Sequence, residues 1–116
     1  MQILNQTKQT VVAQKAILAD TFSSRLKGLL GRDKLSPQEA LIIARCNSIH
    51  MFFMRFPLDV IFVDQDKRVV GLVENIKPFA LSPVFWESFF AVEVSVGTIK
   101  LTHTTLGDRL NFDLNP

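Results

Sequence analysis

Residues 46–64 concentrate the side chains of this chain that could do chemistry. The stretch reads CNSIHMFFMRFPLDVIFVD and holds the only cysteine, Cys46, together with His50, one of two histidines. Arg55 and Asp59 follow, on either side of Phe56-Pro57. Because a thiol, an imidazole, a guanidinium and a carboxylate stand so close along the chain, this stretch is a candidate reaction centre, metal site or binding pocket.

A metal site is the first alternative. Cys46, His50 and Met54 are spaced four residues apart, and thiolate, imidazole and thioether ligands suit copper. Positions four apart on a straight strand lie about 13 Å from each other, so the three side chains cannot meet at one ion without a bend. A single cysteine also excludes a zinc site built on several thiolates. We therefore expect no metal and no other cofactor.

Catalysis is the second alternative. In this hypothesis Cys46 is a nucleophile, His50 a general base and Asp59 the group that orients the imidazole, as in a small hydrolase or transferase. Such a site is defined by geometry in space, which the spacing alone does not supply. The sequence contains no P-loop, dinucleotide-binding fingerprint or zinc signature. It therefore leaves an enzyme open but leans against one.

The third and leading hypothesis is a non-enzymatic ligand-binding or accessory module. Its polar pocket would lie near His50, Arg55 and Asp59, beside a rigid aromatic core. A purely structural role for the same groups is also open: Arg55 would pair with Asp59 across the bend, or Asp59 would accept backbone N–H groups that the proline leaves unmatched. The methionines and phenylalanines around them are typical of a hydrophobic core.

Three further positions complete the candidate residues. Residues 84–90 are rich in aromatic side chains, which favours a thickened local core; the alternative is a protein-interaction module that binds a partner through Phe85 and Trp86. Asp108 follows Gly107 and is expected to fix a turn through its carboxylate, and we include it among the candidate binding residues. Glu93 alternates with apolar neighbours and is expected to face the other side of its sheet. If it points inward instead, it needs Arg25 or Arg32 as a partner, because an unpaired buried carboxylate is costly.

Length and composition limit the class of protein. With 116 residues, 47% hydrophobic and 21% charged, the chain predicts one globular domain over residues 1–116. The net charge is only +2 and its cations are dispersed, which argues against a nucleic-acid partner. No apolar run approaches the roughly 18 residues of a membrane span. With a single cysteine and no apolar run of signal-peptide length, we expect a cytoplasmic protein that makes no membrane contact.

Alternation and turn signals predict a mainly β fold. Extended segments are expected at residues 11–18, 41–43, 46–55, 58–63, 68–73, 89–96 and 109–112. A short helix is expected after Asp20 or Thr21, ending at Gly31, and at most one helical turn at residues 36–39. Strands that follow one another through tight turns favour antiparallel pairing. The prediction is therefore an antiparallel β-sandwich or partly closed barrel with one or two short helices.

The same stretch carries a resemblance to a known family. The sequence resembles the domain-of-unknown-function family 192, a group of uncharacterised small bacterial and archaeal proteins. The strongest match is residues 48–51 with residues 54–64. Supporting matches span nearly the whole chain: Arg25, Gly28-Leu29-Leu30-Gly31-Arg32, Leu35, residues 40–43, Val69-Val70, Pro78, residues 92–94, Gly97 and Gly107-Asp108. The resemblance implies one β-rich domain with short helices, assigns no reaction, and leads us to expect a bacterial source.

Overall fold

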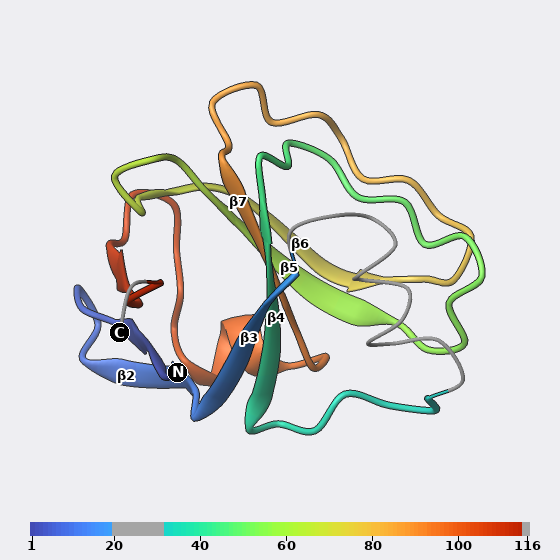
Figure 1. Cartoon of the computed structure of the whole chain (residues 1–116), viewed down its shortest axis with the longest axis horizontal. Helices are drawn as coiled ribbons and strands as arrows, with labels where there is room; N and C mark the ends of the chain where they lie inside the picture. The colour runs from blue at the N-terminus through green and yellow to red at the C-terminus, as the bar shows by residue number, and fades with distance from the viewer. Residues whose placement is uncertain (20–31, 115–116) are drawn as a thin grey trace.

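The computed structural model describes residues 1–19 and 32–114, and in this part of the chain it is mainly β (Figure 1). Eight strands and one short helix occur among these residues: β1 (Ile3–Asn5), β2 (Thr10–Ala13), β3 (Lys15–Ala19), β4 (Glu39–Ala44), β5 (Leu58–Val63), β6 (Val69–Ile76), β7 (Phe90–Val94), α2 (Thr98–Leu101) and β8 (Leu110–Asn111). They form a three-stranded sheet in the order β2-β1-β8 and a five-stranded sheet in the order β3-β4-β7-β5-β6. The predicted fold class is confirmed, and the sheets do not close into a barrel.

The predicted strand at residues 11–18 is two strands. β2 pairs with β1 in the small sheet, whereas β3 pairs with β4 in the large one, so the chain crosses between the sheets at Gln14. β3 and β4 run parallel, in contrast to the antiparallel pairing expected of sequential strands. Parallel neighbours need a crossover of a dozen or more residues, and residues 20–38 supply that length. The predicted helix after Asp20 or Thr21 lies outside the described residues.

The chain break and the hairpin that follows it are confirmed. β5 begins at Leu58, directly after Pro57, and β6 returns antiparallel to it. Proline has no N–H for a ladder and disfavours helix at the residue before it, which explains why the strand starts there. Asp64 closes the hairpin because its Oδ1 accepts the N–H groups of Asp66 and Arg68 at 2.9 and 3.0 Å.

The turn at residues 36–39 agrees with the expectation of at most one helical turn there, whereas the helix α2 has no counterpart in the prediction. Residues 36–39 form a turn, in which the Glu39 N–H donates to the Ser36 carbonyl at 2.9 Å. α2 was not expected from the sequence. It follows Gly97, whose φ of 96° is a left-handed conformation that glycine adopts without the clash a Cβ would cause.

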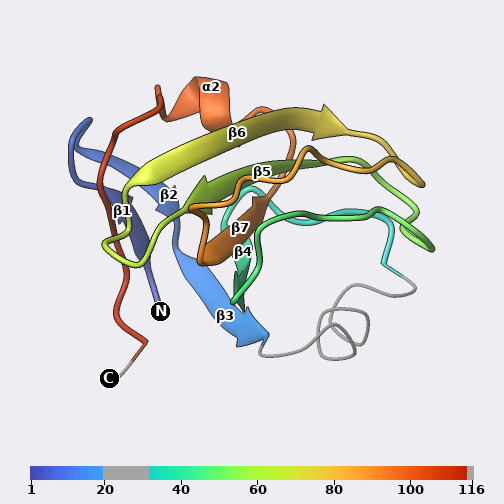
Figure 2. The same cartoon turned by 90° about the horizontal axis from the view of Figure 1, so that it is seen from above.

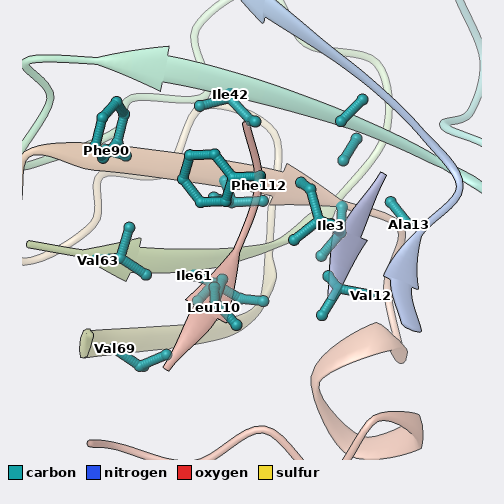
Figure 3. Packing of buried hydrophobic residues seen from close by; sticks show 14 of the residues in the cluster. Ile3, Val12, Ala13, Ile42, Ile61, Val63, Val69, Phe90, Leu110 and Phe112 are labelled. Atoms are coloured by element: carbon teal, nitrogen blue, oxygen red, sulfur yellow. The ribbon is translucent and has the colours of Figure 1, made fainter. Parts of the chain in front are cut away.

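Two hydrophobic clusters cover the two faces of the large sheet. The first lies between the sheets, where Ile3, Leu110 and Phe112 of the small sheet and its tail meet Ile42 and Ile61 of the large one (Figure 3). The second joins the opposite face to the chain that covers it; its members include Leu41, Leu58, Val60, Phe62, Ile49, Met51, Met54 and Phe56. Each fully buried side chain of this kind stabilises the fold by about 1.5–3 kcal/mol. The core interpretation of the apolar residues in 46–64 is therefore confirmed for these members.

Candidate functional site

Asp59 is fully buried, and both of its carboxylate oxygens accept hydrogen bonds from the main chain. Oδ1 accepts the Asn75 N–H at 2.8 Å, and Oδ2 accepts the N–H groups of Gly97 and Ile99, each at 3.1 Å. The last two groups belong to the start of α2, so the carboxylate of a distant strand caps this helix. Asp59 thus ties β6 and α2 to β5.

The alternation of side chains along β5 places Asp59 away from the other candidate residues. Along β5, Leu58 and Val60 belong to the second cluster, so Asp59 between them faces the opposite side of the sheet. The segment that carries His50 covers the face of the second cluster, because Ile49 and Met51 pack there. The structure therefore does not bring Asp59 to His50, and we do not retain it in the candidate site.

Arg55 is exposed and lies near a different carboxylate from the expected one. Its Nη1 is 3.9 Å from Oδ1 of Asp33, and their side chains are 65% and 92% exposed. A long ion pair between two solvated side chains contributes little to stability. Of the two structural alternatives for Asp59, the ion pair with Arg55 is not formed, and the carboxylate accepts backbone N–H groups instead.

Cys46 and His50 both lie half-buried in the covering chain. The Sγ of Cys46 donates to the Ser48 carbonyl at 3.1 Å. The ring of His50 is 4.9 Å from that of Phe52, centroid to centroid. Because Asp59 lies on the other face of the sheet, the structure does not assemble Cys46, His50 and Asp59 as one catalytic group.

Two long connections run side by side from the large sheet, residues 45–57 and residues 77–89 (Figure 2). The backbone of His50 forms an isolated antiparallel bridge with Leu81. Flanking bonds run from Met51 N–H to the Ala80 carbonyl and from Ser82 N–H to the Ile49 carbonyl, both at 2.8 Å. His50 and Leu81 are therefore a non-hydrogen-bonded pair, in which side chains approach most closely.

The two connections end in neighbouring turns that display apolar side chains. One turn is closed by the Met54 N–H to the Met51 carbonyl at 3.3 Å, the other by the Ala80 N–H to the Lys77 carbonyl at 3.1 Å. A bond of 2.7 Å from the Phe79 N–H to the Met51 carbonyl joins them. We call the exposed apolar side chains here the aromatic tip: Phe52, Phe53, Phe79 and Leu81, exposed by 41%, 66%, 64% and 68%.

The sequence pattern assigned Phe52 and Phe53 to the core, although one signal pointed elsewhere. Phe52 and Phe53 are consecutive, and consecutive side chains of an extended chain point in opposite directions. Both could not enter the same core. The Lys77-Pro78 dipeptide before Phe79 is likewise a turn signal rather than a strand.

Phe85 and Trp86 have different environments. The ring of Phe85 packs 4.6 Å from that of Phe62 and joins the second cluster, as expected of a thickened core. Trp86 is 83% exposed. Only the tryptophan of this pair is therefore available to a partner.

Asp108 is buried at the small sheet. Its Oδ2 accepts the Thr105 N–H at 2.9 Å, as expected for a turn, and also bonds from the side chains of Asn5 and Lys8, each at 2.9 Å. Burial alone would raise the pKa of this carboxyl, but the hydrogen bonds outweigh it and lower the pKa from 3.8 to about 2. Asp108 thus joins the 105–108 turn to the N-terminal strand.

This shift predicts a loss of stability in acid. A carboxyl whose pKa is lower in the folded state stabilises the fold above its unfolded value of 3.8, and the contribution is lost as the pH falls toward 2. We expect a loss of about 2 kcal/mol from this group between pH 5 and pH 2. Denaturant unfolding at stepped pH measures it. The variant Asp108→Asn should be less stable at pH 7, and its free energy of unfolding should change less with pH below pH 4. An equally steep loss of stability in acid would contradict the assignment.

Glu93 is fully buried in the large sheet, on the face opposite to Val92 and Val94 as expected. Its neighbours across the ladder are Leu41 and Val60, both of the second cluster. Arg32, one of the partners considered for it, instead donates to Glu39 at 2.7 Å. The other, Arg25, lies outside the described residues.

Residues 1–19 and 32–114 hold no cluster of three or more histidine, cysteine, aspartate or glutamate side chains arranged for a metal ion. Nor does this part of the chain contain a helix long and apolar enough to cross a membrane.

These features define a class: a small β domain of two packed sheets, with paired loops covering one face and ending in an exposed aromatic tip. The chain belongs to the family DUF192, whose description reads "Uncharacterized ACR" and whose model matches residues 3–112. The resemblance noted from the sequence is therefore confirmed, and the family assigns no activity.

Named relatives and a solved structure agree with this placement. A UPF0127 protein of Thermococcus sibiricus is 31% identical, with 97% of this chain and 75% of the relative covered. The UPF0127 protein PF1050 of Pyrococcus furiosus is 33% identical, with 96% and 97% covered. A crystal structure of a protein of unknown function from Novosphingobium aromaticivorans has a TM-score of 0.79 at 24% identity, with 96% and 82% covered, and shows the same fold. These two relatives are archaeal, so they do not favour the expected bacterial source.

Proposed function

We propose that this domain is a non-enzymatic binding module whose aromatic tip docks on a protein partner. Of the three residues predicted to form a pocket, His50 and Arg55 lie next to the aromatic tip along the chain, whereas Asp59 does not. The observation that carries the proposal is the exposure of Phe53 and Phe79 on two turns held together by backbone hydrogen bonds. Large apolar side chains gathered on a surface are typical of interaction sites.

The backbone at these two residues supports the proposal. Phe53 and Phe79 have φ values of 66° and 65°, a left-handed conformation that bulky residues rarely adopt. Each costs about 1 kcal/mol relative to a residue suited to that conformation. Strained positions of this kind cluster at ligand clamps and other functional sites. Here the strain projects aromatic rings outward, where they contribute little to the core.

Charge indicates the chemistry of the partner. Arg55 and Lys77 are exposed beside the tip, and Asp33 offsets Arg55 only through the long contact described above. An apolar surface with cations at its margin is complementary to apolar side chains next to acidic ones. The partner we propose is therefore a protein segment that alternates aliphatic and acidic residues.

A peptide titration tests this function. The probe is a synthetic peptide of alternating leucine and glutamate, and its control replaces each glutamate with lysine. We expect the acidic peptide alone to shift the backbone amide signals of residues 49–54 and 77–82 in a saturable way. The double variant Phe53→Asn/Phe79→Asn should weaken binding at least tenfold. Because asparagine tolerates the left-handed conformation, the melting temperature should stay equal or rise.

Two matched variants make the result decisive. Leu101 is also strongly exposed but lies on α2, and Leu101→Ser should leave peptide binding unchanged. Trp86→Ala should leave the melting temperature nearly unchanged. A loss of peptide binding in this variant would favour the alternative from the sequence, a partner site at Phe85 and Trp86. Equal peptide binding by the double asparagine variant would refute the proposal. So would binding to vesicles of phosphatidylglycerol through the same residues with no response to the peptide, since that result would assign a membrane surface instead.

A further inference from the structure

Two arginines face each other where the β5–β6 hairpin meets the C-terminal strand. Arg68 and Arg109 form an isolated antiparallel bridge. The flanking bonds run from the Val69 N–H to the Asp108 carbonyl at 2.8 Å and from the Leu110 N–H to the Lys67 carbonyl at 2.9 Å. This pattern makes Arg68 and Arg109 a non-hydrogen-bonded pair, whose Cα atoms lie about 4.5 Å apart and whose side chains leave the same face.

Like charges directly opposite each other on paired strands are destabilising. Within residues 1–19 and 32–114, neither guanidinium of this pair is in an ion pair. Among the described residues, a single side-chain hydrogen bond engages either guanidinium, from Nη1 of Arg68 to the Gly107 carbonyl at 3.3 Å, and the other donors of the Arg68 guanidinium remain available. An anion between the two guanidiniums would convert the repulsion into two charge-assisted contacts.

The pair opens on a groove. A surface groove of about 630 Å³ is lined by both arginines, Gln6, Thr7, Lys67 and Asp66, among others. Three cations therefore face one carboxylate. The Thr7 Oγ1 accepts the Arg109 N–H at 2.8 Å, which leaves its hydroxyl hydrogen free to donate. The Lys67 ammonium donates to the Phe112 carbonyl and lies 4.6 Å from the centre of its ring, so it is held at the margin.

The backbone fixes this arrangement before any ligand arrives. The hairpin is tied to the C-terminal strand by the two bonds given above, and the Gln6 N–H donates to the Arg109 carbonyl at 2.8 Å. Three segments distant in the chain thus fix the main chain from which the two arginine side chains extend, so binding has to order only the side chains. We propose that this groove binds a small oxyanionic ligand, carrying phosphate or carboxylate, between the guanidinium groups of Arg68 and Arg109. This site is separate from the aromatic tip and does not depend on its function.

Anion titrations followed by amide chemical shifts test the proposal. The probes are inorganic phosphate and succinate at constant ionic strength, with sodium chloride as the reference. We expect saturable shifts at residues 6–7, 66–69 and 108–111 with one or both probes, and the tighter probe identifies the group that the site takes. Arg68→Gln and Arg109→Gln should each weaken binding at least fivefold, and the double variant should abolish saturation.

A control and a second readout separate binding from structure. Arg45→Gln removes an exposed arginine elsewhere and should leave the affinity for both anions unchanged. Without added anion, Arg109→Gln should melt at the same temperature or higher, because the repulsion is relieved. The binding anion should raise the melting temperature of the original protein but not of the double variant. Shifts that stay linear and equal to those with chloride for both probes, or an equal loss of affinity in Arg45→Gln, would overturn the proposal.

Discussion

Replacing Asp59 with alanine is expected to lower the free energy of unfolding by about 3–5 kcal/mol. The carboxylate is fully buried and accepts N–H groups from Asn75, Gly97 and Ile99. Without it, these donors lose charge-assisted bonds of about 1.5–3 kcal/mol each, offset in part where water reaches the new cavity. Urea unfolding at pH 7 measures the change. Most of the loss should appear as faster exchange of the amide hydrogens of α2 and the end of β6.

Asp64 provides a matched control at the other end of the same strand. It also accepts two backbone N–H groups, from Asp66 and Arg68, but in an exposed turn. Since water replaces a lost partner there, Asp64→Ala should cost only about 1 kcal/mol. The loss of stability in Asp59→Asn should fall between those of Asp59→Ala and Asp64→Ala. The amide keeps one acceptor oxygen but turns its NH₂ group toward backbone donors. Equal losses for Asp59→Ala and Asp64→Ala would show that burial does not set the strength of these contacts.

The sequence carried enough to place Asp59 on a strand but not to find its partners. Pro57 marks the start of β5, and one of the alternatives for a carboxylate next to a proline break was that it accepts backbone N–H groups. The groups it accepts come from residues 75, 97 and 99. They are brought close by the order of the strands in the sheet, which local propensity does not encode. The chemistry was therefore predictable and the geometry was not.

The aromatic residues illustrate the same limit. The apolar stretches at residues 58–63 and 89–96 identified β5 and β7, and both strands are buried throughout because each face of their sheet is covered. In residues 45–57 and 77–89 the chain turns irregularly, and hydrophobicity alone does not separate Phe56, which is buried, from Phe53, which is exposed. The opposed pair Arg68 and Arg109 was equally hidden, because it depends on a bridge between segments forty residues apart.

Replacing Gly71 with alanine is expected to cost about 2–3 kcal/mol. Gly71 lies on β6 opposite Phe62, and the ring of Phe85 covers it. A Cβ at Gly71 would overlap Cδ1 of the Phe85 ring, well inside van der Waals contact. The ring already packs against Phe62, so relief requires the loop that carries Phe85 to move. Thermal and urea unfolding measure the loss.

A double-mutant cycle attributes that loss to the ring. Phe85→Ala alone should destabilise by about 2 kcal/mol, because a large apolar side chain leaves a half-buried site. In that background Gly71→Ala should cost nothing and even stabilise by about 0.5 kcal/mol, since alanine loses less backbone entropy than glycine in a strand. The coupling between the two positions should then be about 2–3 kcal/mol. If Gly71→Ala costs the same with and without the ring, glycine at residue 71 is needed for the backbone conformation and not for the space under Phe85. The docking of residues 77–89 then depends on other contacts.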